Sequence, residues 1–215
     1  RARRPVRTDT TMSKITLHPG TPIKIAILAM GGQGGGVLAD WIVEMAEDAG
    51  WWAQTTSVPG VAQRTGATIY YLELLPEAAA QAAGAPPTLA MMPTPGDVDL
   101  VVAAELMEAG RAMQRGLVSP ARTTLITSSH RSYAVGEKAA LGNGIADPNK
   151  VIDAGREAAR RLMCFDLQEM AERAGSVISA SLFGAIAGSG ALPFERTAFE
   201  RTIRRGGTGV EASLA

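Results

Sequence analysis

Two kinds of hydrophobic pattern alternate along this chain of 215 residues. Apolar runs, continuous or alternating, predict strands, and they cover Lys24–Met30, Trp51–Ser57, Ala67–Leu75, Val98–Glu105 and Thr123–Ser129. Apolar residues spaced three or four apart predict helices, and these cover Val37–Gly50, Leu106–Leu117, Val151–Leu162, Asp166–Gly175, Ser176–Gly190 and Pro193–Gly207. This alternation predicts an α/β fold with an open, mostly parallel, doubly wound sheet, helices on both faces and extra C-terminal helices.

Local signals refine the ends of these elements. The helix after the first strand carries one apolar face, formed by Val37, Leu38, Trp41, Ile42 and Met45, and Gly50 suits its C-cap. Pro193 suits the first turn of the last helix, and Gly206 and Gly207 suit its end. Residues 76–97 predict a short helix or an irregular excursion, and residues 130–150 predict a long loop with room for a short edge strand.

Composition suggests how the chain is divided. Four arginines among the first seven residues predict a flexible basic tail over residues 1–21. An α/β domain is then expected over 22–165, with 166–215 as a C-terminal helical part of the same domain. Because the sequence begins with Arg and stops abruptly, we expect the natural polypeptide to be longer and to continue beyond residue 215, with Met12 as an internal or alternative start. No apolar stretch follows the arginines, as a secretory signal would require.

Charge and cysteine content narrow the function classes. The formal net charge is zero, which gives no support to nucleic-acid or anionic-membrane binding. The single cysteine, Cys164, excludes an internal disulfide and cannot hold an iron–sulfur cluster alone. With only two histidines in the sequence, a His-rich zinc site is not expected, and the cytoplasm is the expected compartment.

The longest uncharged run, 176–194, is slightly short for a membrane span and predicts a buried helix in a water-soluble protein. Within it, Ser176, Ala180, Gly184 and Gly188 recur every four residues. On a helix these small residues form one stripe, against which another backbone could approach closely.

The segment "GGQGGG", residues 31–36, lies between the first predicted strand and helix. Such a turn presents free N–H groups and a helix N-terminus to an anion. The dinucleotide fingerprint fails because Val37 replaces its third glycine and no acidic residue ends the second strand. The P-loop fails because Val37 stands where lysine is required. Two interpretations remain open: direct ligand contact by Gly32, Gln33, Gly34 and Gly35, or close packing of the turn beneath a partner subunit.

Two further clusters follow later strands. Ser57, Gln63 and Arg64 come after the second strand, and in a doubly wound sheet they are expected at the same carboxyl edge as Gln33. Arg64 carries forked donors suited to a carboxylate or phosphate, although it could equally hold the loop through a salt bridge. His130, after the fifth strand, is expected to be structural rather than catalytic.

Four segments together resemble a known family: "MGGQGGGVLADWI", "SVPGVAQRTGAT", the stretch from "VVAAELMEAGRAMQRGLVSP" to "YAVGEK", and "GSVISASLFGAIAGSGALPF" with "IRRGG". They resemble the small (beta) subunit of indolepyruvate ferredoxin oxidoreductase and, more broadly, the gamma-type domain of 2-oxoacid:ferredoxin oxidoreductases. The resemblance covers roughly residues 22 to 215. Thr65 stands where many relatives have a glycine after the Gln–Arg pair.

The resemblance implies chemistry shared with other chains. It implies oxidative decarboxylation of indolepyruvate and other aryl-pyruvates to the aryl-acetyl-CoA, with electrons passed to ferredoxin. Thiamine diphosphate, Mg and the 4Fe-4S clusters would belong to a large partner subunit in a heterotetramer, and coenzyme A would be a co-substrate. No catalytic residue is expected in this chain; Gly32, Gln33, Gly34, Gly35, Ser57, Gln63 and Arg64 would form an edge that faces thiamine, coenzyme A or substrate.

Three other interpretations stay open. The chain could be a free-standing dinucleotide enzyme, which the missing acidic residue disfavours. It could be a purely structural assembly subunit. It could also serve a family member that acts on another 2-oxoacid, such as phenylglyoxylate or a branched-chain acid.

Overall fold

The structure is a computed structural model that describes residues 15, 20–59, 67–132, 147–207 and 209–215. Its strands are β1 (Ile23–Met30), β2 (Trp51–Val58), β3 (Ala67–Pro76), β4 (Leu100–Ala103), β5 (Thr124–Ser128) and β6 (Arg161–Phe165). Its helices are α1 (Gly35–Asp48), α2 (Glu77–Ala83), α3 (Leu106–Gln114), α5 (Pro148–Ala158), α6 (Leu167–Arg173), α7 (Ile178–Ser189), α8 (Arg196–Arg205) and α9 (Val210–Leu214). The predicted basic tail lies almost wholly outside the described residues, and the predicted division at residue 165 stays a prediction.

The strands form one mixed sheet in the order β2-β3-β1-β4-β5-β6. β1, β4, β5 and β6 run parallel, which confirms the mostly parallel sheet. β3 is antiparallel to both of its neighbours, so β2 regains the direction of β1. The carboxyl ends of β1 and β2 therefore lie at the same edge of the sheet, with the start of β3 between them.

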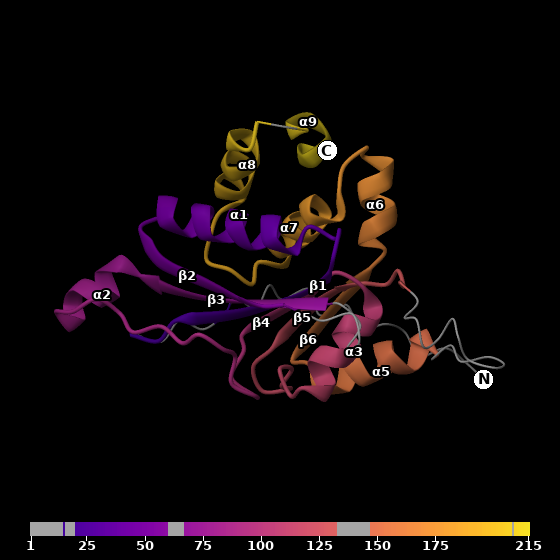
Figure 1. The fold of residues 1–215 in the computed structure, drawn as a ribbon, viewed down its shortest axis with the longest axis horizontal. Helices are drawn as coiled ribbons and strands as arrows, with labels where there is room; N and C mark the ends of the chain where they lie inside the picture. Colours follow the sequence, from indigo (N-terminus) through magenta and orange to yellow (C-terminus); the bar gives the residue numbers. More distant parts are fainter. Residues whose placement is uncertain (1–14, 16–19, 60–66, 133–146, 208) are drawn as a thin grey trace.

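Helices cover both faces of the sheet, as predicted (Figure 1). α1, α7 and α8 lie on the face that we call upper, where Leu38, Ile42 and Phe183 belong to the larger apolar core. α3 and α5 lie on the lower face, where Ala109 and Ala112 of α3 belong to the second core. The chain leaves β1 through an upper helix and β4 through a lower helix, so the neighbouring strands β1 and β4 form a topological switch point.

The predicted helix over 151–162 is wrong at its C-terminal end. α5 ends at Ala158, Ala159 is extended, and Arg161–Phe165 forms β6 in parallel register with β5. The hydrogen bonds that β5 offers at this position explain the strand, because sheet pairing depends on a partner that helical periodicity in the sequence does not reveal. This strand and the short helix α9 were not predicted.

Smaller expectations are also corrected. Val37 is 47% exposed and does not belong to the buried face of α1, whereas Leu38, Ile42 and Met45 do. Pro193 precedes α8, which begins at Arg196. The short helix within 76–97 is α2, and the rest of that segment crosses without regular structure to β4.

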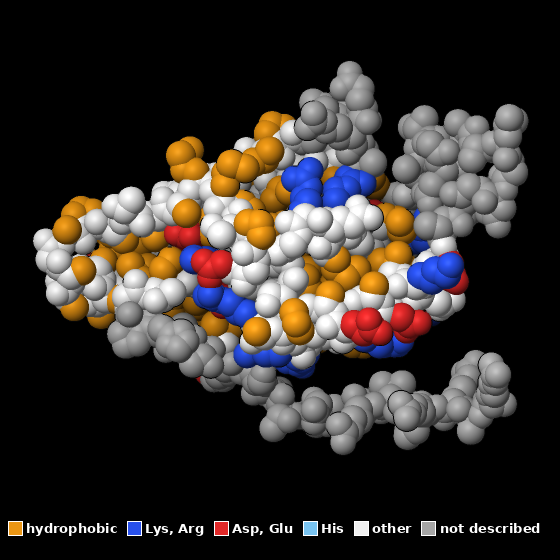
Figure 2. All heavy atoms as spheres, turned by 90° about the horizontal axis from the view of Figure 1, so that it is seen from below, with side chains coloured by type: hydrophobic (Ala, Val, Ile, Leu, Met, Phe, Trp, Pro, Cys, Tyr) orange, Lys and Arg blue, Asp and Glu red, His pale blue; other side chains and the backbone are white. Residues whose placement is uncertain are grey.

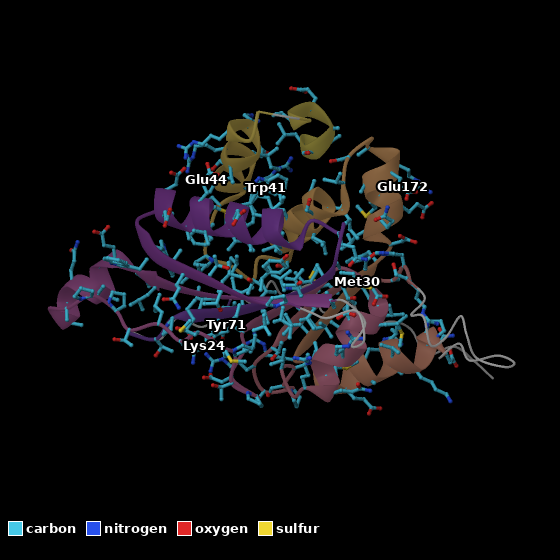
Figure 3. The ribbon with its side chains drawn as sticks, in the orientation of Figure 1. Lys24, Met30, Trp41, Glu44, Tyr71 and Glu172 are labelled. Atoms are coloured by element: carbon cyan, nitrogen blue, oxygen red, sulfur yellow. The ribbon has the colours of Figure 1, made fainter. Side chains whose placement is uncertain are left out.

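The amino edge of the sheet is closed by ion pairs. Asp99, 5% exposed, accepts from Lys24 N at 2.9 Å and from Arg122 Nε at 2.6 Å, while Asp97 pairs with both Lys24 and Arg122. Figure 3 places Lys24 toward this end of the sheet and Met30 at the opposite end of β1, where the glycine turn begins. The amino edge is thus occupied by the protein's own charges, and the carboxyl edge carries the candidate site.

Candidate functional site

The glycine-rich turn connects β1 to α1 at the switch point. Gln33 N donates to Met30 O at 3.1 Å, Gly32 has φ +85°, and Gly34, the N-cap of α1, has φ +67°. These positive φ values are costly for residues with a Cβ, so both positions favour glycine. Among the described residues no side chain caps α1, so within that part of the chain its first N–H groups are available to an anion or solvent.

The glycines of this turn face two different surroundings. A Cβ at Gly35 would lie 2.6 Å from Ala29 Cβ and 2.7 Å from a ring carbon of Tyr70. A Cβ at Gly34 would lie 2.9 Å from Ser179 Oγ, at the start of α7. At Gly31 and Gly32, by contrast, a Cβ would meet no atom of the described residues within 4 Å. The second half of the turn packs against its own chain, and the first half is open.

Gln33 holds the turn through its side chain. Its Oε1 accepts a hydrogen bond from Met30 N at 2.8 Å, which closes a reciprocal pair with the bond from Gln33 N to Met30 O. The amide oxygen is therefore committed to the turn, and the amide nitrogen takes no part in that bond. Contact between Gln33 and a ligand stays a prediction.

Ser57 lies at the same edge as the turn. It is exposed near the end of β2 and pairs across the ladder with Tyr70, which in turn pairs with Ile27. Paired residues share a face of the sheet, so Ser57 lies on the upper face beside the tyrosine that packs against Gly35 and Gly36. Gln63 and Arg64 lie outside the described residues, and their convergence on this edge stays a prediction.

At the next strand of the switch point, Glu105 anchors the start of α3. It is 1% exposed and accepts from Glu108 N at 2.9 Å, Met107 N at 3.1 Å and Ser132 N at 3.3 Å. Glu105 was not singled out in the sequence, although the Glu108 three residues later is a helix-start signal. It joins α3 to the segment after β5 and fixes the geometry of the carboxyl edge.

His130, also at this edge, is half-buried. Its Nδ1 lies 2.7 Å from Ser128 Oγ, which accepts from Leu167 N at 3.1 Å. Burial lowers the pKa of His130, against the opposing charges of Glu105, Asp166 and Glu172. The ring contacts Ser128 and lies close to α6, and the structural role expected for His130 stays a prediction.

Glu108 is the other buried carboxylate of this region. It is 1% exposed and pairs with Arg111 at 3.1 Å, while its Oε2 has no hydrogen-bond partner among the described residues. Burial raises the pKa of Glu108, and the arginines Arg111 and Arg115 oppose that rise. The partly unpaired acid stabilises α3 less than a fully paired one would.

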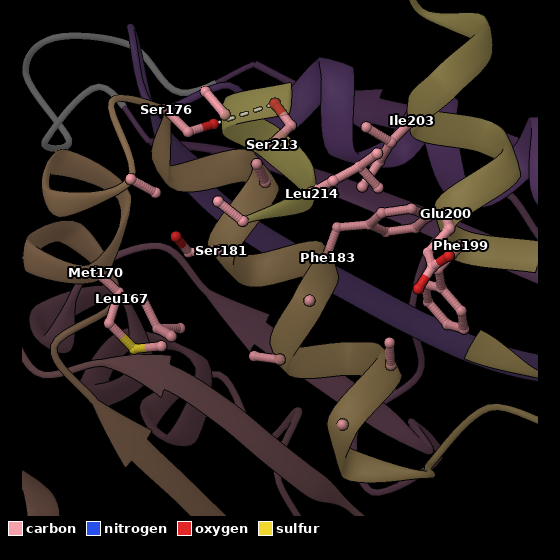
Figure 4. Close-up of a pocket in the computed structure, with 18 of the residues that line it drawn as sticks. Leu167, Met170, Ser176, Ser181, Phe183, Phe199, Glu200, Ile203, Ser213 and Leu214 are labelled. Carbon is pink, nitrogen blue, oxygen red and sulfur yellow. Dashed lines mark hydrogen bonds between the residues drawn. The ribbon is translucent and has the colours of Figure 1, made fainter. Parts of the chain in front are cut away.

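A hollow of about 730 Å³ lies over α7 between α6, α8 and α9 (Figure 4). The small-residue stripe lines it, and a Cβ at Gly184 or Gly188 would meet nothing within 4 Å. The stripe is therefore open toward this groove in the described part of the chain, and close approach of another backbone stays a prediction.

The described residues contain no group of three or more His, Cys, Asp or Glu placed to hold a metal ion. Among the same residues, every helix is too short or too polar to cross a bilayer.

The sheet order, the switch point and the glycine turn together define an α/β protein of the doubly wound class, with a ligand crevice expected outside the carboxyl ends of β1 and β4. The chain belongs to the pyruvate ferredoxin/flavodoxin oxidoreductase family, whose model matches residues 24–213. A comparison with curated proteins gives no match.

Solved structures share the fold. The pyruvate oxidoreductase subunit PORC of Thermotoga maritima is 15% identical with a TM-score of 0.58, and the match covers 90% of this chain and 91% of that one. The gamma subunit of keto/oxoacid ferredoxin oxidoreductase from Geobacter sulfurreducens is 14% identical with a TM-score of 0.54, covering 89% and 91%.

The same fold occurs within a longer chain. A 2-oxoglutarate:ferredoxin oxidoreductase from Magnetococcus marinus, solved with 2-oxoglutarate, coenzyme A and succinyl-CoA bound, is 13% identical with a TM-score of 0.56. The match covers 90% of this chain but only 29% of that chain. At these identities the likeness establishes the fold.

Proposed function

We propose that this chain is the non-cluster subunit of a cytoplasmic, thiamine-dependent 2-oxoacid:ferredoxin oxidoreductase that acts on indolepyruvate and other aryl-pyruvates. Membership of the oxidoreductase family over residues 24–213 is the observation that carries the proposal. The indolepyruvate branch rests on the resemblance of the "ELMEAGRAMQRGLVSP" and "IRRGG" segments.

The cysteine count agrees with a division of labour between this chain and a partner. With one cysteine in the sequence, the iron–sulfur clusters must belong to a larger partner, which would also hold thiamine diphosphate and Mg. Thiamine diphosphate held by that partner would supply the carbanion chemistry of decarboxylation, with ferredoxin as the electron acceptor and coenzyme A as the acyl acceptor.

This chain would contribute the wall of the shared site. The open Gly31 and Gly32 let an anionic group approach the backbone, and the uncapped N-terminus of α1 supplies N–H donors with favourable dipole charge. The diphosphate of coenzyme A has the charge that these donors favour. Ser57 and Arg64 would complete the edge, with Arg64 as a forked donor to phosphate or carboxylate.

The first test is purification of the native complex that contains this chain. The expected partner is a large iron–sulfur chain, and the expected activity is reduction of a viologen dye that depends on both indolepyruvate and coenzyme A. Higher kcat/KM with phenylglyoxylate or a branched-chain 2-oxoacid would redirect the substrate assignment while preserving the subunit role. A monomer without such a partner would contradict the proposal.

The site assignment needs its own test. In the assembled complex, Arg64→Ala should raise the KM for coenzyme A or substrate and weaken coenzyme A binding measured directly by equilibrium dialysis. Arg156→Ala is the matched control, because Arg156 lies on α5, pairs with Asp153 on the same helix and is 61% exposed. If Arg64→Ala leaves kinetics and binding unchanged, the chain is better described as a structural assembly subunit.

A further inference from the structure

The two outer strands of the sheet, β6 and β2, differ in how they are protected against pairing with another strand. β6, at one edge, is five residues long, begins with a charged residue, Arg161, and is anchored where Arg161 Nη1 donates to Ser189 O at 2.7 Å. β2, at the other edge, has eight residues, "WWAQTTSV", with neither charge nor proline. Its register with β3 is unbroken from Trp51 to Val58, without a bulge. Charges, prolines, bulges and short length are the usual means of blocking edge-to-edge pairing, and β2 has none of them.

β2 is also held in place on its lower face. Gln54 Nε2 donates to Ala90 O at 3.0 Å, and Thr56 Oγ1 donates to Met91 O at 2.7 Å. Ala90 and Met91 belong to the segment that crosses from α2 to β4, which we call the crossing segment. This segment is also fixed to β3, because Glu73 Oε2 accepts a hydrogen bond from Ala90 N at 2.8 Å. A strand that is already fixed loses little conformational freedom when another strand pairs with it.

Hydrophobic side chains surround this edge. Trp52 is 45% exposed and Val58 is 38% exposed, and both lie on the lower face with Gln54 and Thr56. Hydrophobic side chains project from the lower face in the space-filling view (Figure 2). Met91, on the crossing segment, is 72% exposed. Such an edge offers both backbone hydrogen bonds and apolar contacts to an extended segment.

The order of residues along β2 indicates which segment would pair with it. Trp52 and Val58 lie equally far from Thr55, so antiparallel pairing of two identical strands about Thr55 places each Trp52 opposite the other copy's Val58. Gln54 then lies opposite Thr56, and Thr55 opposite itself. A twofold axis perpendicular to the sheet keeps both upper faces on one side, and such an interface is self-complementary by construction.

We infer that β2 pairs with β2 of a second copy of this chain, antiparallel and centred on Thr55, to give one sheet that runs through both copies. This pairing brings Trp52 of the second copy beside Val58, which is next to Ser57 at the carboxyl edge of the sheet. The inference rests on the edge strand alone and holds whichever 2-oxoacid the complex uses.

Cross-linking in the intact complex tests the register. Opposed residues of an antiparallel pair have Cα atoms about 4.5–5.5 Å apart, within disulfide range. Thr55→Cys should therefore form a covalent dimer of this chain under mild oxidation with copper–phenanthroline. In the same register the two copies of Ser57 have Cα atoms about 14 Å apart, so Ser57→Cys should not cross-link. The wild-type chain, with Cys164 alone, gives the background.

Each alternative result would overturn the inference. Cross-linking by Ser57→Cys but not Thr55→Cys would show another register. A disulfide or photo-cross-link from position 55 to a different subunit would show a different occupant of the edge. A complex that contains one copy of this chain by native mass spectrometry would exclude self-pairing altogether.

A charge variant gives an independent readout. Thr55→Lys places two ammonium groups directly opposite each other at the axis and should weaken self-association by about tenfold or more. Thr55 is exposed, so the fold should tolerate the change, which circular dichroism checks. Gln114→Lys, at the exposed end of α3, adds the same charge elsewhere and should leave self-association unchanged. Equal association constants for Thr55→Lys and wild type, by sedimentation, would overturn the inference.

Discussion

The two halves of the glycine-rich turn look alike in sequence and differ in space. Gly34 and Gly35 are bare because Ser179, Ala29 and Tyr70 occupy the volume that a Cβ would need. Gly31 and Gly32 adjoin open space, and nothing in the described chain accounts for the missing side chain at Gly31. A run of glycines can therefore combine an internal packing requirement with an approach route for a ligand or partner, and single substitutions separate the two.

The largest effect is expected at Gly35. Gly35→Ala forces overlap with Ala29 and Tyr70, and should lower the free energy of unfolding by about 1–3 kcal/mol. Urea denaturation measures the loss. Gly36→Ala is the control, because its Cβ would lie 3.6 Å from Tyr70 in ordinary contact. That variant should be neutral or more stable by up to about 1 kcal/mol, since Ala favours helix. Equal destabilisation of both variants would contradict the packing argument.

Gly34→Ala should follow in size. It places a Cβ in the left-handed region at φ +67° and close to Ser179 Oγ, which costs about 1–2 kcal/mol of unfolding free energy. Gly34→Asn should recover part of the backbone cost, because Asn tolerates this region better than Ala. If Asn is no better than Ala, the clash with Ser179 dominates over the backbone strain.

Gln33→Ala should have an intermediate effect. It removes the hydrogen bond from Met30 N to the side chain at a half-buried position, which costs about 1 kcal/mol. Gln168→Ala, which loses the bond to Glu172 on the surface of α6, is expected to cost less than about 0.5 kcal/mol. Hydrogen exchange of the Met30 amide gives a local readout, and unchanged protection in Gln33→Ala would show that the side chain does not hold the turn.

His130 extends the comparison to the next strands of the carboxyl edge. Because burial holds its folded pKa below the ordinary value of 6.5, the unfolded chain binds more protons as the pH falls through that range. The contribution of His130 to the free energy of unfolding is fully present above pH 6.5 and is lost as the pH falls toward the pKa of the folded state. Denaturant titrations at a series of pH values should show that the free energy of unfolding falls less with decreasing pH for His130→Gln than for wild type. Identical pH profiles would show that His130 is as accessible folded as unfolded.

The smallest change in stability is expected at Gly31. Gly31→Ala meets open space at a position without positive φ and should alter the unfolding free energy by no more than about 0.5 kcal/mol. If the proposed function is right, the same variant should raise the KM for coenzyme A in the assembled complex. Unchanged kinetics would mean that the open half of the turn faces neither ligand nor active site.

Much of the fold was predictable because its signals are local. The apolar run of Lys24–Met30 and the three- to four-residue spacing of Leu38, Ile42 and Met45 are visible in sequence and correspond to β1 and α1. β6 was missed because the helical pattern of "VIDAGREAARRL" was continued to Leu162, and the strand at Arg161–Phe165 depends on pairing with β5, which the local pattern does not reveal.

The candidate site was predictable in part. The glycine turn and Ser57 could be placed at one edge from strand direction alone, and the register confirms that they share it. The bond from Ser132 N to Glu105 could not be predicted, because the fold brings together two residues that are 27 positions apart. The bond between Gln33 and Met30 joins residues three positions apart and depends on the conformation of the turn. Gln63 and Arg64 remain predictions.

The sequence by itself determined most of the elements, their order along the chain and the resemblance to the family, because periodicity, turn residues and motif order are properties of short segments; it did not determine β6 or α9. Only the tertiary structure decided that β3 runs against its neighbours, that an uncharged strand lies at the edge, and that Gly35 is enclosed while Gly31 is open. The physical reason is that pairing and close approach depend on atoms far apart in the chain. Tyr70 lies 35 residues from the glycine whose side chain it excludes.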